Sequence, residues 1–253
     1  MSANLILGSS HALVLARAVG VFAEDREAAM RDLVRIESPR DAQNSLLFTT
    51  NRPGFLELKA GPNAPTTSPF GPLMDKVRAF NRPDAKVILG IGGNEHNIRF
   101  LTADPRPFDF VHPAFPGVEP GRQVIPAREM AAVMRALVER TLVVTRLIAA
   151  ELPKAQLHYL PPPPPIPSDE HLRANREIFD FARLGIEAAG VRLKLHALYM
   201  EIIGDFCAAT GVQLIPPVAK HQDERGFLAQ PYWQGATHAT SAYYAGIVSD
   251  LGL

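Results

Sequence analysis

Short apolar runs alternate along the chain with stretches that repeat apolar residues every three or four positions. The runs have the length of buried strands and lie at residues 5–7, 46–48, 87–91, 156–160 and 212–215. Between them, the stretch 130–148 shows the helical period most clearly. Alternation of this kind predicts an α/β fold with a parallel sheet and helices on both faces. We therefore predict a three-layer α/β/α sandwich with a five-stranded parallel sheet, formed as one domain by residues 1–253.

Bulk composition excludes several classes of protein. The chain has 253 residues, which fits one α/β domain, and its formal net charge is +0, so neither nucleic acid nor an anionic membrane is expected as a partner. Cys207 is the single cysteine, so no internal disulfide can form. We find no removable leader at Met1 and no apolar run that could span a bilayer, and we expect a cytoplasmic location.

The first strand ends in a block that can carry chemistry, Gly8-Ser9-Ser10, and a helical pattern starts directly after it. A hydroxyl group there would sit at a helix N-terminus, where unpaired N–H groups and the helix dipole favour negative charge. Such a position suits a nucleophilic serine and its oxyanion. The alternative is that Ser9 or Ser10 only caps the helix.

Two further polar clusters follow later strands. Gly92-Gly93-Asn94-Glu95 comes after the run at 87–91, and Ala236-Thr237-His238 comes after the run at 212–215. In a parallel sheet, ligands bind beyond the carboxyl ends of the strands. A serine, an asparagine and a histidine placed there can act as nucleophile, oxyanion donor and general base.

Together the three clusters resemble the motif blocks of the SGNH hydrolases, also called the GDSL-type esterase/lipase superfamily. That superfamily carries Gly-Asp-Ser after the first strand, a glycine after the second, Gly-x-Asn-Asp after the third and Asp-x-x-His near the C-terminus. In this sequence serine replaces the first aspartate at Ser9, glutamate the second at Glu95, and glycine the third at Gly235. The glycine of the second block is assigned to Gly54, with Gly61 as the next candidate.

The resemblance implies a flavodoxin-like SGNH fold and a residue set for ester hydrolysis. Ser10 would be the nucleophile and His238 the base, while the backbone N–H groups of Ser10 and Gly54 and the side chain of Asn94 would form the oxyanion hole. The implied substrate is a small-molecule ester, for example an O-acetylated carbohydrate. These groups suffice for the reaction, so neither a metal ion nor an organic cofactor is expected.

Gly235 is the departure that matters most, because the missing aspartate would fix the tautomer of His238. A backbone carbonyl could hold His238 instead, or Asp223 or Glu224 could supply a substitute carboxylate. The remaining alternatives are an O-acyltransferase that uses the same serine, and a catalytically degraded protein that binds a ligand or partner.

Residues 98–126 have no clear period and combine prolines with aromatic residues. A loop of this length inside a domain is usually functional or disordered, and its aromatic content argues against disorder. We interpret it as a packed excursion that either walls a pocket or covers the edge of the sheet.

Overall fold

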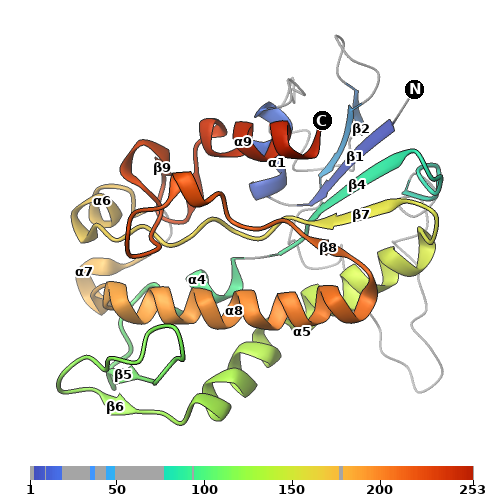
Figure 1. The fold of residues 1–253 in the computed structure, drawn as a ribbon. Helices are drawn as coiled ribbons and strands as arrows, with labels where there is room; N and C mark the ends of the chain where they lie inside the picture. Colours follow the sequence, from blue (N-terminus) through green and yellow to red (C-terminus); the bar gives the residue numbers. More distant parts are fainter. Residues whose placement is uncertain are drawn as a thin grey trace.

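The computed structural model describes residues 3–8, 10–18, 35–37, 44–48, 77–92, 94–176 and 179–252. Its strands and helices alternate along the chain, as the apolar runs predict (Figure 1). The strands are β1 (Ala3–Gly8), β2 (Arg35–Glu37), β3 (Asn44–Phe48), β4 (Ala85–Gly90), β5 (Phe108–Asp109), β6 (Gln123–Val124), β7 (Gln156–Tyr159), β8 (Gln213–Leu214), β9 (Trp233–Gln234) and β10 (His238–Ala239). The helices are α1 (Ser10–Ala18), α4 (Glu95–Phe100), α5 (Ala127–Glu151), α6 (Asp169–Ala174), α7 (Phe181–Leu184), α8 (Ala189–Thr210) and α9 (Ser241–Leu251).

One sheet organises the fold, with the strand order β2-β3-β1-β4-β7-β8. All neighbouring pairs in it are parallel except β2 and β3, which are antiparallel. The predicted α/β class with a parallel sheet is therefore confirmed. The predicted number of strands differs from the structure, which has six strands in this sheet among the described residues, because β2 adds an antiparallel edge.

The two faces of the sheet bury alternate side chains of each strand against different helices. Leu5 and Leu7 of β1 belong to a core that includes residues of α5 and α8, whereas Ile6 belongs to a second core with residues of α1 and α9. This is the period-2 alternation of a strand covered on both sides. Figure 1 shows α5 and α8 on one side of the sheet and α1 and α9 on the other.

Two glycines at the carboxyl ends of the central strands allow α1 to pack closely. Gly8 of β1 lies opposite Gly90 of β4 in the sheet. A Cβ atom on Gly8 would lie 2.2 Å from the carbonyl oxygen of Gly90 and 2.8 Å from the Cβ of Ala12. The absence of a side chain at Gly8 thus sets the short path from β1 into α1, and this path decides where Ser10 lies.

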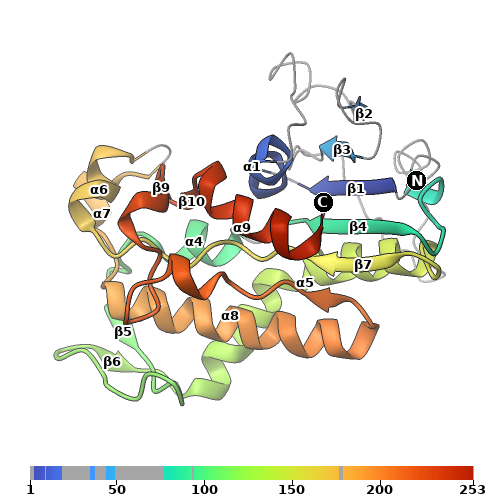
Figure 2. The ribbon, with the colours of Figure 1, turned by 45° about the horizontal axis from the view of Figure 1, so that its top comes forward.

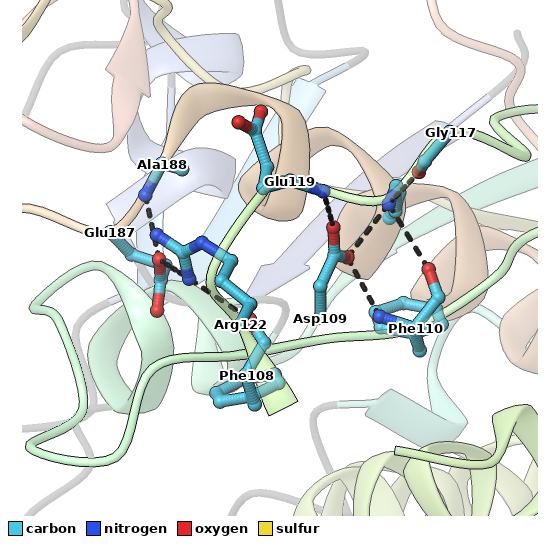
Figure 3. A network of polar contacts seen from close by, with 9 residues as sticks. Phe108, Asp109, Phe110, Gly117, Glu119, Arg122, Glu187 and Ala188 are labelled. Atoms are coloured by element: carbon cyan, nitrogen blue, oxygen red, sulfur yellow. Dashed lines mark hydrogen bonds and ion pairs between the residues drawn. The ribbon is translucent and has the colours of Figure 1, made fainter. Parts of the chain in front are cut away.

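The excursion between α4 and α5 is tied to α8 by a buried ion pair (Figure 3). Lys194 Nζ of α8 donates to Asp109 Oδ1 at 2.7 Å and to the carbonyl oxygens of Phe110 at 3.1 Å and Gly117 at 2.5 Å. Asp109 also accepts from the backbone N–H groups of Phe110 at 2.7 Å and Glu119 at 2.8 Å. With this many hydrogen bonds, both charges can be buried without being left unpaired.

None of the helices within the described ranges combines the length and the hydropathy needed to cross a bilayer. The cellular location and the single-domain organisation expected from the sequence stay predictions.

Candidate active site

Ser10 is the first residue of α1, two residues after the end of β1. It is half-buried, and the first turn of α1 contains no acidic residue. As the first residue of α1 it lies in the turn with the unpaired backbone N–H groups, where a negative charge is stabilised.

His238 is the first residue of β10 and contacts His11, the second residue of α1. The ring of His238 packs on the ring of His11, with 4.8 Å between their centroids. His11 is itself buried, and its Nδ1 is 3.3 Å from the hydroxyl oxygen of Tyr244 in α9. Burial, with a smaller contribution from His238, lowers the pKa of His11 to about 3. His11 is therefore neutral near pH 7, and its ring packs against the ring of His238.

Asn94, which follows β4, is linked to His238 through the side chain of Thr237. It occupies the N-cap position of α4, where an asparagine side chain usually accepts from the helix backbone, but it makes no such bond. Instead its Nδ2 donates to Thr237 Oγ1 at 2.9 Å, and its Oδ1 accepts from Asn97 Nδ2 at 3.0 Å. Thr237 Oγ1 in turn lies 3.2 Å from His238 Nδ1.

The structure thus joins the second and third predicted clusters by side-chain hydrogen bonds, and the first cluster reaches them through His11, the residue after Ser10. Figure 2 shows α4 and the β9–β10 segment beyond the same end of the sheet as the head of the β1 arrow. The oxyanion glycine assigned to Gly54, its alternative Gly61 and the neighbouring serine Ser9 lie outside the described residues.

Glu95, which stands where the superfamily has an aspartate, is hydrogen-bonded to α5. Its Oε1 accepts from Thr141 Oγ1 of α5 at 2.5 Å. The Glu95 side chain also lies against Gly92, since a Cβ atom added to Gly92 would be 2.3 Å from Glu95 Oε1. Gly92 has a φ of 64°, a value that favours glycine. In this protein the carboxylate therefore holds the turn between β4 and α4.

The position of the missing aspartate is a tight turn between β9 and β10. Gly235 has a φ of 55°, and its carbonyl oxygen accepts a hydrogen bond of 2.9 Å from His171 Nε2 of α6. The carbonyl of Gly235 is therefore bonded to His171, and the expectation that a backbone carbonyl holds His238 stays a prediction.

The two substitute carboxylates lie in a separate turn of the chain. Asp223 accepts from the backbone N–H groups of Arg225 at 3.0 Å and Phe227 at 2.9 Å, and from the side chain of Arg225. Glu224 lines a pocket described below. Within the described ranges, neither carboxylate makes a hydrogen bond or ion pair with His238, and Thr237 is the side chain beside its Nδ1.

Three residues of the site were not singled out by the sequence analysis. Thr237 was quoted within its motif without a role, although its place directly before His238 was a usable signal. His11 lies four residues before Leu15 on the apolar side of the first helix, which predicts burial. For Asn97 the only signal was its distance of three residues from Asn94 on a helix.

The excursion at 98–126 lines a pocket, which is one of the two roles that the sequence left open. Phe100, Phe108 and Phe110 belong to the core between the sheet and the helices. Phe115, Gly117, Val118 and Glu119 line a pocket of about 740 Å³, together with the start of α8 and Phe227. Within the described residues, no group of three His, Cys, Asp or Glu side chains is placed to hold a metal ion.

Comparisons with known proteins reach only distant relatives. The sequence matches no protein-family model and no curated protein. Solved structures to which the chain is similar include the three that follow, each at 14% identity or less.

The first is a Streptococcus pneumoniae protein assigned as a platelet activating factor, at 14% identity over 66% of this chain, with a TM-score of 0.40. This chain spans 57% of the length of that structure. The second is the periplasmic domain of a Salmonella Paratyphi A lipopolysaccharide acetyltransferase, at 11% identity, covering 99% of this chain and 82% of that one, with a TM-score of 0.48. The third is a phospholipase A1 from Streptomyces albidoflavus, at 14% identity, covering 98% of both chains, with a TM-score of 0.48.

Proposed function

We propose that this protein is a serine ester hydrolase of the SGNH type, with Ser10 as nucleophile and His238 as general base. The observation that supports this most is the side chain of Asn94. It sits at a helix N-cap but is directed to Thr237, next to His238, instead of capping the helix. A purely structural asparagine at this position would be expected to cap.

The proposed reaction uses groups that the fold already holds. Ser10 Oγ attacks the ester carbonyl carbon while His238 Nε2 takes its proton, and the imidazolium then gives that proton to the leaving alkoxide. The oxyanion is stabilised by the N–H of Ser10 at the start of α1 and by Asn94, whose Nδ2 carries a second hydrogen besides the one donated to Thr237. The N–H of Gly54 is a further proposed donor. Water, activated by His238, releases the acyl group.

The proposed substrate is a small-molecule ester such as an O-acetylated carbohydrate, and no cofactor takes part. Half-burial of Ser10 and Asn94 supports access by a small ligand. An acyltransferase would share every step up to the acyl-enzyme and differ only in using an alcohol in place of water. The flavodoxin-like SGNH variant of the α/β fold and a cytoplasmic location belong to the same proposal.

Turnover of a panel of p-nitrophenyl esters, from acetate to octanoate, tests the proposal. We expect the protein to release p-nitrophenol, Ser10→Ala to abolish release, and Ser9→Ala to retain it as the matched control. Loss of activity in Ser9→Ala alone would move the nucleophile by one residue. Products formed with an added sugar acceptor would identify an acyltransferase. A folded protein that turns over no ester would contradict the proposal and favour a ligand-binding protein.

A further inference from the structure

The hydroxyl group of Thr237 lies between two groups of the candidate site. Thr237 is buried, and its Oγ1 is 2.9 Å from Asn94 Nδ2 and 3.2 Å from His238 Nδ1. It is the residue directly before His238, in the turn that joins β9 to β10. Gly235, where the superfamily has its aspartate, carries no side chain, and Asp223 is hydrogen-bonded within its own turn.

The direction of the hydrogen bond between Asn94 and Thr237 follows from the inventory of donors, whereas that between Thr237 and His238 depends on the tautomer of His238. Asn94 Oδ1 accepts from Asn97 Nδ2, so the group of Asn94 that faces Thr237 is the amide nitrogen, which can only donate. One lone pair of Thr237 Oγ1 is used by this bond. A hydroxyl oxygen has two lone pairs, so the second can accept the Nδ1–H of His238.

We propose that Thr237 is the positioning residue of His238 and takes the place of the missing aspartate. Its Oγ1 accepts the Nδ1–H, which holds the imidazole in the tautomer whose Nε2 lone pair can take the proton of Ser10. The proton moves from Ser10 Oγ to His238 Nε2 as the bond to the carbonyl carbon forms, and the Nδ1–H and the Thr237 hydroxyl proton stay in place. This inference rests on the proposed function and deepens it.

The hydroxyl group orients His238 but brings no negative charge. A carboxylate fixes the tautomer and also stabilises the imidazolium that forms during the reaction. With Thr237 in this role only the first effect remains, so turnover is expected to be slow yet strongly dependent on the hydroxyl group. In a serine protease, loss of tautomer control in the triad costs about 10⁴-fold in kcat, which bounds the effect expected here.

Three variants test this role. Thr237→Val removes the hydroxyl and keeps the shape, Thr237→Ser keeps the hydroxyl, and Thr240→Val is the matched control. Thr240 lies three residues later in the same segment, and in the described part of the chain its buried hydroxyl has no hydrogen-bond partner. The readouts are kcat and KM for a p-nitrophenyl ester and the His238 tautomer in the resting protein, measured by ¹⁵N NMR.

We expect the native protein to show the Nδ1–H form of His238, and Thr237→Val to lose it. In that variant kcat should fall by roughly a hundred-fold or more with KM little changed, since the role concerns the base and not ground-state binding. Thr237→Ser should restore both readouts, and Thr240→Val should alter neither.

A native protein whose His238 carries its proton on Nε2 would overturn the inference, as would a Thr237→Val variant that keeps both tautomer and kcat. The tautomer is measured without substrate, so the test separates the two proposals. A protein that turns over no ester contradicts the proposed function. Loss of the Nδ1–H form in Thr237→Val would still support the positioning contact.

Discussion

Three buried histidines predict that acid will unfold this protein through groups in its core. His11 in α1, His96 in α4 and His196 in α8 are each almost fully inaccessible to solvent. Neither ring nitrogen of His96 or His196 has a hydrogen-bond partner in the described part of the chain. Burial lowers the pKa of all three, to about 3 for His11, to about 4 for His196, and well below the usual range for His96.

The direction in which the free energy of unfolding changes with pH follows from proton linkage. Below the unfolded-state pKa of 6.5 the unfolded chain binds protons at these positions and the folded chain does not. The free energy of unfolding is therefore highest above pH 6.5 and falls as the pH drops towards the folded-state values. At about 1.4 kcal/mol per pH unit, His11 and His196 each remove about 3 kcal/mol of stability by pH 4.5. Two such losses are comparable to the lower end of the stability of a typical domain, 5–15 kcal/mol in total.

Urea unfolding at pH 7.5 and pH 4.5 measures this effect, followed by circular dichroism and by fluorescence of the single tryptophan, Trp233. We expect His196→Leu to lose less stability between the two pH values than the native chain, by about 3 kcal/mol. Tyr199→Phe is the control, because it removes the 3.0 Å contact with the hydroxyl of Tyr159 without removing a group that titrates in this range. It should lower stability by about 1 kcal/mol at both pH values. Equal losses in His196→Leu and the native chain would refute the reasoning.

Three more predictions concern single contacts. Lys194→Met should lower the free energy of unfolding in urea by about 3–5 kcal/mol, because it leaves Asp109 charged and buried without its cation; a full-stability variant would contradict the role of the ion pair. Gly92→Ala should lower Tm clearly, given its φ of 64° and lack of space for a Cβ atom, whereas Gly117→Ala, which has open space, should not. Gly235→Asp should raise the esterase rate at least several-fold by supplying a carboxylate, since aspartate tolerates a positive φ better than most residues; an unchanged rate in the folded variant would show that no carboxylate is needed.

Much of the sheet could be predicted because its strands are buried on both faces. The runs at 5–7 and 87–91, which became β1 and the end of β4, are apolar throughout, which is the pattern of strands covered by helices on both sides. β2 gave no such signal, since Arg35–Glu37 is three residues long with two charged ends. An edge strand of this length exists through pairing with β3 and has no periodicity of its own.

The candidate site was predictable in outline and not in detail. Strand ends and helix starts are local features, so the positions of Ser10 and Asn94 follow from the sequence. Which group faces Nδ1 of His238 depends on how a turn late in the chain folds against α4, 143 residues away in sequence. The carboxylates Asp223 and Glu224 looked suitable because they lie near His238 in the chain, but the hydrogen bonds of the 223–227 turn hold Asp223 elsewhere.

Covalent labelling by a fluorophosphonate probe, with the modified residue mapped by peptide mass spectrometry, tests the central claim most directly. The probe reacts with a serine that an adjacent base activates, so no knowledge of the natural ester is needed. The account predicts one label on Ser10 in the native chain, retained in Ser9→Ala, lost in Ser10→Ala, and much slower to form in His238→Ala. A native, folded protein that takes no label at Ser10 would contradict it.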